Sequence, residues 1–317
     1  MNLTRTASAT ALIVALLGTA AATVAWRGAT AAPDTGTLQL TRPGTLVLVD
    51  GHGTRVHQKT REGTDIGTGP DCRRAAVAAG TLVCLQGLPG PFSSEVRIYR
   101  PGRTAPEVTL PVWGNPSRAR VSPTGHLVAW TVFRSGDSYV ASGQFSTTAG
   151  IYDLRTGDHY GSLEDFAVLL DGNRTPPEDR NFWGITFAAD DRTFYATMSA
   201  KGSTHLMRGD LTTRELTALR TNVECPSLSP DETRIAYKKR VGADWQLHVL
   251  HLGTGQDTPL AAPPGIDDQA AWLDDSTVAY GRTEQGRSLV YAVPADGSGK
   301  PVQLAEGSSP SMTTSAR

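Results

Sequence analysis

The sequence has no excess of charge of either sign. Its 317 residues include 30 lysines and arginines against 31 aspartates and glutamates, a formal net charge of −1. A nucleic-acid-binding face needs a basic excess, which is missing here, and there is no acidic tail either. Nucleic acid is therefore not expected as a partner. With 39% hydrophobic and 19% charged residues, the composition predicts a folded core rather than a disordered chain.

The sequence also lacks the motifs of common hydrolases and nucleotide-binding enzymes. No G-x-S-x-G segment occurs, so the nucleophile elbow of an attached hydrolase domain is absent. Gly297-Ser298-Gly299-Lys300 resembles the end of a phosphate-binding loop, but Pro301 stands where Ser or Thr must hold magnesium. We interpret this segment as a turn between strands and predict no cofactor.

Cysteine is scarce, and the three cysteines form no C-x-x-C or zinc-binding spacing. Cys72 and Cys84 lie near the two ends of an apparent hairpin whose turn falls at Ala79-Gly80. Adjacent strands bring such residues close together, so we predict a disulfide between them. Cys225 is left over; it is interpreted as a small buried side chain, with a reactive thiol as the alternative.

Residues 1–31 differ from the rest of the chain. No charged residue occurs from Thr6 to Trp26, and the apolar stretch Ala11 to Ala25 has the length of a signal-peptide core. Ala29-Thr30-Ala31 supplies a cleavage site, so we predict a signal peptide over 1–31, with an uncleaved membrane anchor as the alternative. In both cases the folded part is expected outside the cytoplasm, secreted or associated with the cell envelope.

The most informative feature that is present is a turn. Leu228 to Leu250 reads LSPDETRIAYKKRVGADWQLHVL, in which Ser229-Pro230-Asp231-Glu232 is a tight turn between residues that suit β-strands. Proline fixes φ at the second turn position, and aspartate tolerates the bridge conformation that follows it. A second strand, Trp245 to Leu250, is predicted after a polar break. The 33 glycines and 20 prolines suit many short strands of this kind.

The same turn recurs along the chain. Equivalent units begin at Leu40, Val77, Val121, Phe187, Leu228 and Trp272. Their spacings are 37, 44, 66, 41 and 44 residues, and four of the five lie close to the period of propeller blades, about 40–45 residues. Each unit also carries a second pair of predicted strands, and four short strands per unit are typical of a blade.

The two ends of the repeat array complement each other. The first unit lacks a convincing strand before its turn, whereas residues 307–312 follow the last unit. We predict that this tail supplies the missing inner strand of the first blade, which removes an open sheet edge. The predicted fold is all-β: a monomeric six-bladed β-propeller over residues 35–317, with four-stranded blades, closed by pairing of its N- and C-terminal segments.

The repeat L-S-P-D-x-x-x-I-A-Y, followed by a strand and a G-x-G turn, resembles the TolB-like β-propeller repeat. The stretches NFWGITFAADDRTFYATM and VECPSLSPDETRIAYKKR carry the likeness best, and residues 35–317 are similar to secreted actinobacterial proteins of this type. The resemblance implies binding of a protein or peptide at one face or in the channel. It implies no particular reaction.

Candidate metal ligands are few. His248 and His251 are three residues apart on a predicted strand, so alternation places them on opposite faces, where they cannot share a metal. The aspartate pairs 190/191, 267/268 and 274/275 raise the possibility of calcium. Two of these pairs sit in the repeated turn, where aspartate is favoured for local geometry, and we predict no metal site.

In a propeller, the residues that open the inner strands surround the mouth of the central channel. At these positions the chain offers a mixture of polar, charged and aromatic side chains that suits a peptide or a polar ligand: Asn115, Arg118, Asn181, Trp183, Glu224, Asp268 and Gln269. For Trp183 the alternative is that its side chain fills the gap between two blades.

Two segments of the third unit, 134–149 and 158–181, are longer than the blade plan needs. Long loops on a rigid scaffold often carry function, although neutral variation of a tolerant surface is equally compatible with them. We predict a non-catalytic extracytoplasmic propeller that binds a protein or peptide partner at the channel mouth or these loops. The alternatives are a lactonase-like enzyme with a channel-bound metal and a membrane-anchored sensor domain.

Overall fold

The computed structural model describes residues 37–51, 54–135, 145–174, 177–266 and 268–315. These residues belong to one compact unit. The predicted signal peptide, residues 1–31, lies outside the described residues. Within the described ranges, no helix is long and apolar enough to span a membrane.

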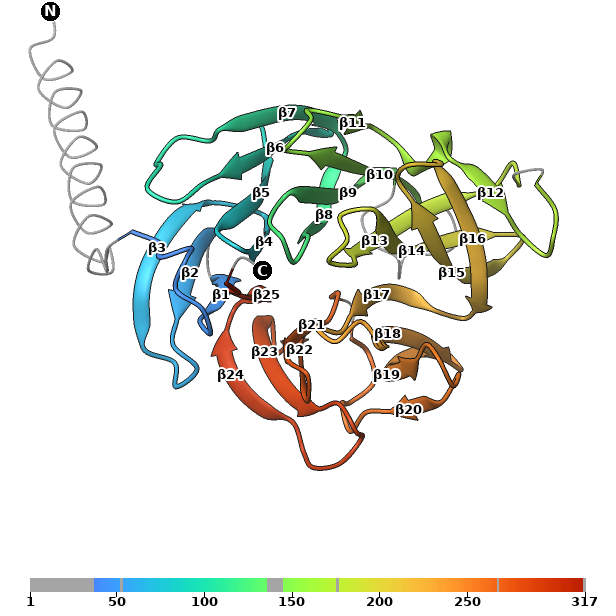
Figure 1. The fold of residues 1–317 in the computed structure, drawn as a ribbon. Helices are drawn as coiled ribbons and strands as arrows, with labels where there is room; N and C mark the ends of the chain where they lie inside the picture. Colours follow the sequence, from blue (N-terminus) through green and yellow to red (C-terminus); the bar gives the residue numbers. More distant parts are fainter. Residues whose placement is uncertain (1–36, 52–53, 136–144, 175–176, 267, 316–317) are drawn as a thin grey trace, which may run out of the picture. The chain divides into compact units, whose positions relative to one another are not determined.

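The described chain forms six antiparallel blades arranged in a ring (Figure 1). From the inside outward, the first three blades are β25 (Ser308–Met312), β1 (Leu46–Val49), β2 (Arg55–Lys59), β3 (Asp65–Asp71); β4 (Arg74–Ala78), β5 (Thr81–Gly87), β6 (Ser93–Tyr99), β7 (Val108–Trp113); and β8 (Asn115–Val121), β9 (Leu127–Ser135), β10 (Ser146–Asp153), β11 (His159–Tyr160). The other three are β13 (Asn181–Phe187), β14 (Thr193–Ala200), β15 (Ser203–Asp210), β16 (Glu215–Thr221); β17 (Glu224–Leu228), β18 (Arg234–Val241), β19 (Asp244–His251), β20 (Asp257–Pro259); and β21 (Ala271–Asp274), β22 (Thr277–Glu284), β23 (Arg287–Pro294), β24 (Val302–Glu306). The predicted six-bladed propeller is confirmed.

The repeated turn joins each inner strand to the second strand of its blade. In blade 5, the Ser229 N–H donates to the Arg234 carbonyl at 2.8 Å, and the Glu232 N–H donates to the Ser229 carbonyl at 2.9 Å. Asp231 is the acceptor at the centre of the turn. Partial burial alone would raise the pKa of its carboxyl, but hydrogen bonds from Ser229, Thr233 and Arg234 hold that pKa well below its usual range. The acidic residue therefore serves the turn.

The hydrophobic core lies between neighbouring blades. One cluster joins Leu247 and Val249 of blade 5 to Val278 and Tyr280 of blade 6, all of them buried. The blades are also tied by hydrogen bonds, such as the one from the Trp272 indole N–H to the Ser227 carbonyl at 2.9 Å. Because each blade covers the apolar face of the next, the ring must be complete to bury its core.

The ends of the ring close as predicted. β25 pairs antiparallel with β1, with Leu46 opposite Met312, so the last strand lies beside the first in Figure 1. A buried polar network adds to this pairing: the hydroxyls of Thr45 and Thr313 are 2.7 Å apart, and the Gln58 Nε2 donates to the Thr45 hydroxyl at 2.6 Å. The innermost strand of blade 1 thus comes from the opposite end of the sequence.

The segment 158–181 is only partly an addition to the blade plan. Its first residues form β11, the fourth strand of blade 3. A short 3-10 helix, η1 (Leu163–Asp165), follows, and then β12 (Ala167–Leu169) pairs parallel with β16 as a fifth strand of blade 4. The segment therefore joins two blades, which explains the long spacing between the third and fourth units. Of the segment 134–149, residues 136–144 lie outside the described residues.

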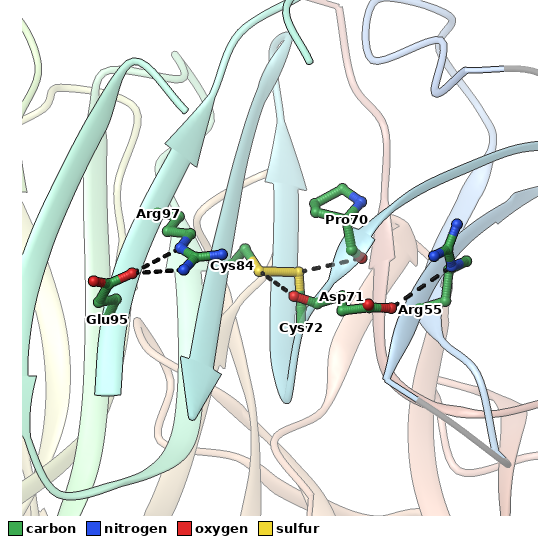
Figure 2. The surroundings of a disulfide bond; sticks show 7 residues. All are labelled: Arg55, Pro70, Asp71, Cys72, Cys84, Glu95 and Arg97. Atoms are coloured by element: carbon green, nitrogen blue, oxygen red, sulfur yellow. Dashed lines mark hydrogen bonds and ion pairs between the residues drawn. A yellow bond between two sulfur atoms is a disulfide. The ribbon is translucent and has the colours of Figure 1, made fainter. Parts of the chain in front are cut away.

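The predicted disulfide between Cys72 and Cys84 is confirmed, with a Cα–Cα distance of 5.3 Å. Figure 2 shows it where the chain passes from blade 1 to blade 2, next to the ion pairs of Arg55 with Asp71 and of Arg97 with Glu95. The third cysteine, Cys225, is a buried free thiol, as interpreted from the sequence.

Replacing both bridged cysteines by serine (C72S/C84S) is expected to lower the free energy of unfolding by about 3 kcal/mol, because the bridge restricts the unfolded chain. Denaturant titration of the wild type and the double variant, each with and without a reductant, measures this effect. Reductant should destabilise the wild type alone. A wild type that unfolds at the same denaturant concentration with and without complete reduction would contradict the prediction.

Candidate functional site

The central channel is surrounded by the innermost strands of the six blades, whose successive members are in contact around the ring (Figure 1). We call the end where these strands begin the opening end, and the end that carries the repeated turns the turn end. Side chains alternate along a strand, so Arg118 and Arg120 of β8 share one face. Both of them line cavities in the channel.

The opening end contains the larger cavity, about 390 Å³ in volume. Blade 1 contributes Asp50, and the crossing from blade 1 to blade 2 contributes Arg73. Arg74 and Arg118 lie on the inner strands β4 and β8, and Asp268 lies in the segment before β21. Arg282 of blade 6 completes the charged lining and is paired with Glu284 at 2.9 Å. The described lining thus brings four guanidinium groups and two carboxylates into one open cavity.

Asp268 organises the inner wall of this cavity. Its carboxylate accepts backbone N–H groups from Gln269 at 2.9 Å and Ser309 at 3.1 Å, and it lies 3.8 Å from the Arg118 guanidinium. Burial alone would raise the pKa of this carboxyl, but the charges of Arg118 and Arg74, together with these N–H groups, hold the pKa below its ordinary value. Asp268 is therefore a fixed anion that positions arginine side chains.

Polar side chains cross the channel below Asp268. The Arg120 guanidinium reaches from blade 3 to blade 6 and donates to the Ala270 carbonyl at 2.9 Å. Gln269 reaches the other way, and its Nε2 donates to the carbonyls of Pro226 at 2.7 Å and Ile185 at 3.3 Å. The cavity left at this waist is only about 20 Å³. The waist separates the opening-end cavity from a second cavity at the turn end.

The turn-end cavity has a volume of about 120 Å³ and is lined by residues from all six blades. Its lining mixes apolar residues, such as Phe187, Leu228, Trp272 and Met312, with polar ones, such as Thr186, Ser227 and Ser311. Arg120 lines both this cavity and the waist. The two ends of the channel therefore differ in chemistry: the opening-end cavity is larger and rich in charged residues, whereas the turn-end cavity is smaller and has a mixed apolar and polar lining.

No protein-family model and no curated protein matches the sequence. Solved structures match the fold. TolB from Acinetobacter baumannii is 17% identical with a TM-score of 0.61, over 85% of this chain and 66% of that one. The putative TolB from Agrobacterium tumefaciens is 11% identical with a TM-score of 0.50, over 83% and 89% of the two chains. A chain in the crystal structure of a nidogen/laminin complex is 10% identical with a TM-score of 0.50, over 85% and 97%.

The fold is that of a TolB-like six-bladed propeller. At these identities the likeness concerns the fold alone, and the chain spans slightly less than two thirds of the length of the Acinetobacter TolB.

Three of the seven site residues that the sequence predicts lie in the channel of this TolB-like propeller. Arg118 and Asp268 line the opening-end cavity, and Gln269 lies at the waist. Asn115 is exposed at the start of β8. The Asn181 side-chain oxygen accepts the backbone N–H of Thr147 at 2.9 Å, and this bond ties blade 4 to blade 3.

The remaining two predicted site residues are buried. Trp183 is 1% exposed and packs in a cluster with Phe133, Cys225 and Trp245. Glu224 is buried, and its carboxylate accepts the Trp245 indole N–H at 2.9 Å. The geometry of Trp183 favours the alternative that its side chain fills the gap between blades.

Four arginines that line the channel were not singled out from the sequence: Arg73, Arg74, Arg120 and Arg282. The repeat register contains a signal for one of them. Arg74 stands three residues before Val77, the start of the second unit, as Arg118 stands three residues before Val121. The two arginines therefore occupy equivalent positions on neighbouring inner strands. Arg282 comes from a second strand, which the prediction did not consider.

His248 and His251 have structural partners within blade 5. The His248 Nδ1 lies 2.9 Å from the Asp257 carboxylate, which also accepts the Tyr237 hydroxyl, and so three strands of blade 5 are joined. Burial lowers the pKa of His248, and Asp257 opposes that shift. His251 instead accepts the Gly253 N–H in a turn. Among the described residues, no three histidine, cysteine, aspartate or glutamate side chains form a group that suits a metal ion.

Proposed function

We propose that this TolB-like propeller is a non-catalytic, extracytoplasmic binding module that holds an acidic segment of a protein or peptide partner at its opening end. The observation that carries the proposal is the open cavity of about 390 Å³ with four arginines in its lining. Guanidinium groups bind carboxylates through paired, charge-assisted hydrogen bonds, and this geometry is specific as well as strong.

The arrangement of charges supports binding of an extended partner. The Arg118 guanidinium lies 3.8 Å from Asp268, and the Arg74 Nε donates to the Ser117 carbonyl at 2.9 Å. The charges of both arginines lower the pKa of Asp268. Arg73, by contrast, is exposed, and Arg282 is only partly buried, so both are accessible to a large partner. Inner arginines that are fixed by the fold lose little conformational freedom on binding, which favours affinity.

Two further observations support the extracytoplasmic and non-catalytic parts of the proposal. The disulfide is of the kind that persists in oxidising compartments. One fold neighbour comes from the crystal structure of a nidogen/laminin complex, so a chain of this fold occurs in an assembly of two proteins. The competing lactonase-like hypothesis predicts stoichiometric calcium or zinc in the purified protein, which elemental analysis measures directly.

The proposal is tested with a fluorescent aspartate-rich peptide and its asparagine counterpart, by fluorescence anisotropy. The wild type is expected to bind the acidic peptide but not the asparagine peptide. R73E/R282E is expected to bind the acidic peptide at least tenfold more weakly, which corresponds to a loss of about 1.4 kcal/mol in binding free energy. R192E is the matched control. Arg192 is a surface arginine that pairs with Asp210 at 2.6 Å and does not line the cavity.

The same three proteins are then used to capture partners from a cell-envelope extract. A partner that is recovered by the wild type and R192E but not by R73E/R282E supports the proposal. Equal binding of the two peptides by the wild type, or unchanged binding by R73E/R282E, would exclude the arginine-lined cavity as the binding site.

A further inference from the structure

The turn-end cavity plays no part in the proposed function, yet it contains the most unusual charge in the channel. Arg120 lies at the inner end of this cavity, and its guanidinium crosses the channel to the Ala270 carbonyl. Among the described residues, the Arg120 side chain is partly buried, and its Nε is buried without a hydrogen-bond partner. Such a guanidinium retains hydrogen-bonding capacity for an anion.

The surroundings of Arg120 destabilise its charge. Burial, together with a smaller effect of the like charge of Arg118, lowers the pKa of Arg120 to about 10, against the opposing effect of Asp268. Asp268 itself is engaged with Arg118 and with two backbone N–H groups. An anion next to Arg120 would therefore stabilise a charge that the fold leaves poorly compensated.

The lining of the cavity limits the size and charge of the ligand that carries the anionic group. Phe187, Leu228, Trp272 and Met312 line it, and the volume of about 120 Å³ leaves room for a group of only a few carbon atoms. Glu232 stands at the rim as an exposed carboxylate, and its Oε1 accepts the Ala189 N–H at 2.6 Å. A second negative charge on the ligand would meet this carboxylate, so a single charge is favoured.

We propose that the turn-end cavity binds a monocarboxylate with a short aliphatic group, the carboxylate on the Arg120 guanidinium and the alkyl group against the apolar residues of the lining. Two sources share this chemistry: a free short-chain acid, and the C-terminal aliphatic residue of a peptide. The site lies at the opposite end of the channel from the acidic-partner site and does not depend on it.

The decisive comparison uses the wild-type protein and isothermal titration calorimetry. Isovalerate is the free-acid probe, and isovaleramide is its neutral control of the same shape. A short peptide ending in leucine, with a free or an amidated C-terminus, is the second pair. In at least one of the two pairs, the acid is expected to bind and the corresponding amide is not. The pair in which the acid binds shows whether the natural ligand is a free acid or a peptide C-terminus. The result does not depend on the folding of any variant.

Variants then locate the site. Arg120→Gln is expected to weaken binding of the acid at least tenfold and leave the amide unaffected, whereas Arg192→Gln, a surface arginine outside the cavity, should bind as the wild type does. Circular dichroism confirms that each variant is folded before titration. The proposal is overturned if acid and amide bind with equal affinity, if neither acid binds in the millimolar range, or if folded Arg120→Gln retains full affinity.

Discussion

Deletion of residues 308–317 is expected to abolish cooperative unfolding of this protein. The deletion removes β25, the inner strand of blade 1, and with it the buried network of Thr313 with Thr45. β25 also joins blade 1 to blade 2, because the Ser311 hydroxyl accepts the Val77 N–H and donates to the Val77 carbonyl, each at 3.0 Å. A whole domain is stable by only about 5–15 kcal/mol, so loss of an inner strand and its buried hydrogen bonds is expected to be severe.

Thermal unfolding followed by circular dichroism, with size-exclusion chromatography, measures this result. The expected behaviour is a broad transition without a sharp midpoint, together with association through the edge of β1 that the deletion exposes. Deletion of residues 316–317 alone is the control and should unfold as the full chain does. A truncated protein with a sharp transition at the wild-type temperature would show that ring closure is dispensable.

Asp268→Asn is expected to cost about 3 kcal/mol of stability, because removal of one partner from a buried charge pair is strongly destabilising. Asp268 faces Arg118 at 3.8 Å and accepts two backbone N–H groups, and the amide that replaces it can satisfy these groups only in part. The exposed Asp275 is the matched control, and D275N should stay within about 0.5 kcal/mol of the wild type.

The stabilising effect of Asp268 also has a defined pH dependence. Its folded-state pKa is lowered, so its contribution is fully present above the ordinary aspartate pKa, about 3.9, and is lost as the pH falls through the folded-state value. Urea titrations of the wild type and D268N between neutral pH and pH 3 test this point. The difference in unfolding free energy between the wild type and D268N should become smaller only at the lowest pH values of this range. A difference that is constant over the whole range would contradict an ionised Asp268.

The fold could be predicted from the sequence because its signals are local and repeated. Each turn, such as Ser229 to Glu232, is determined by a few neighbouring residues, and its recurrence gives the number of blades. The disulfide was predictable for the same reason, since Cys72 and Cys84 belong to one hairpin. Ring closure by residues 307–312 followed from the number of predicted inner strands. The first repeat unit lacked one, and one was left over after the last repeat unit.

The candidate site was less predictable because it depends on contacts across the ring. Arg118 and Asp268 were found from their positions at the opening end. That Arg120 reaches Ala270, 150 positions away in the sequence, depends on the diameter of the channel, which no local pattern encodes. Trp183 shows the converse problem: its position on an inner strand suggested the channel, but packing against Trp245 of the next blade buries it.

Ring closure has a practical consequence for how the protein is handled. After β25 the chain leaves the ring past Thr314, which itself lines the turn-end cavity. An affinity tag or fusion partner joined after Ser315 therefore starts beside that cavity and competes for access to it. Immobilisation through the C-terminus on a biosensor surface would leave the opening end facing solvent and cover the turn end. Binding assays for the two ends consequently need opposite attachment points.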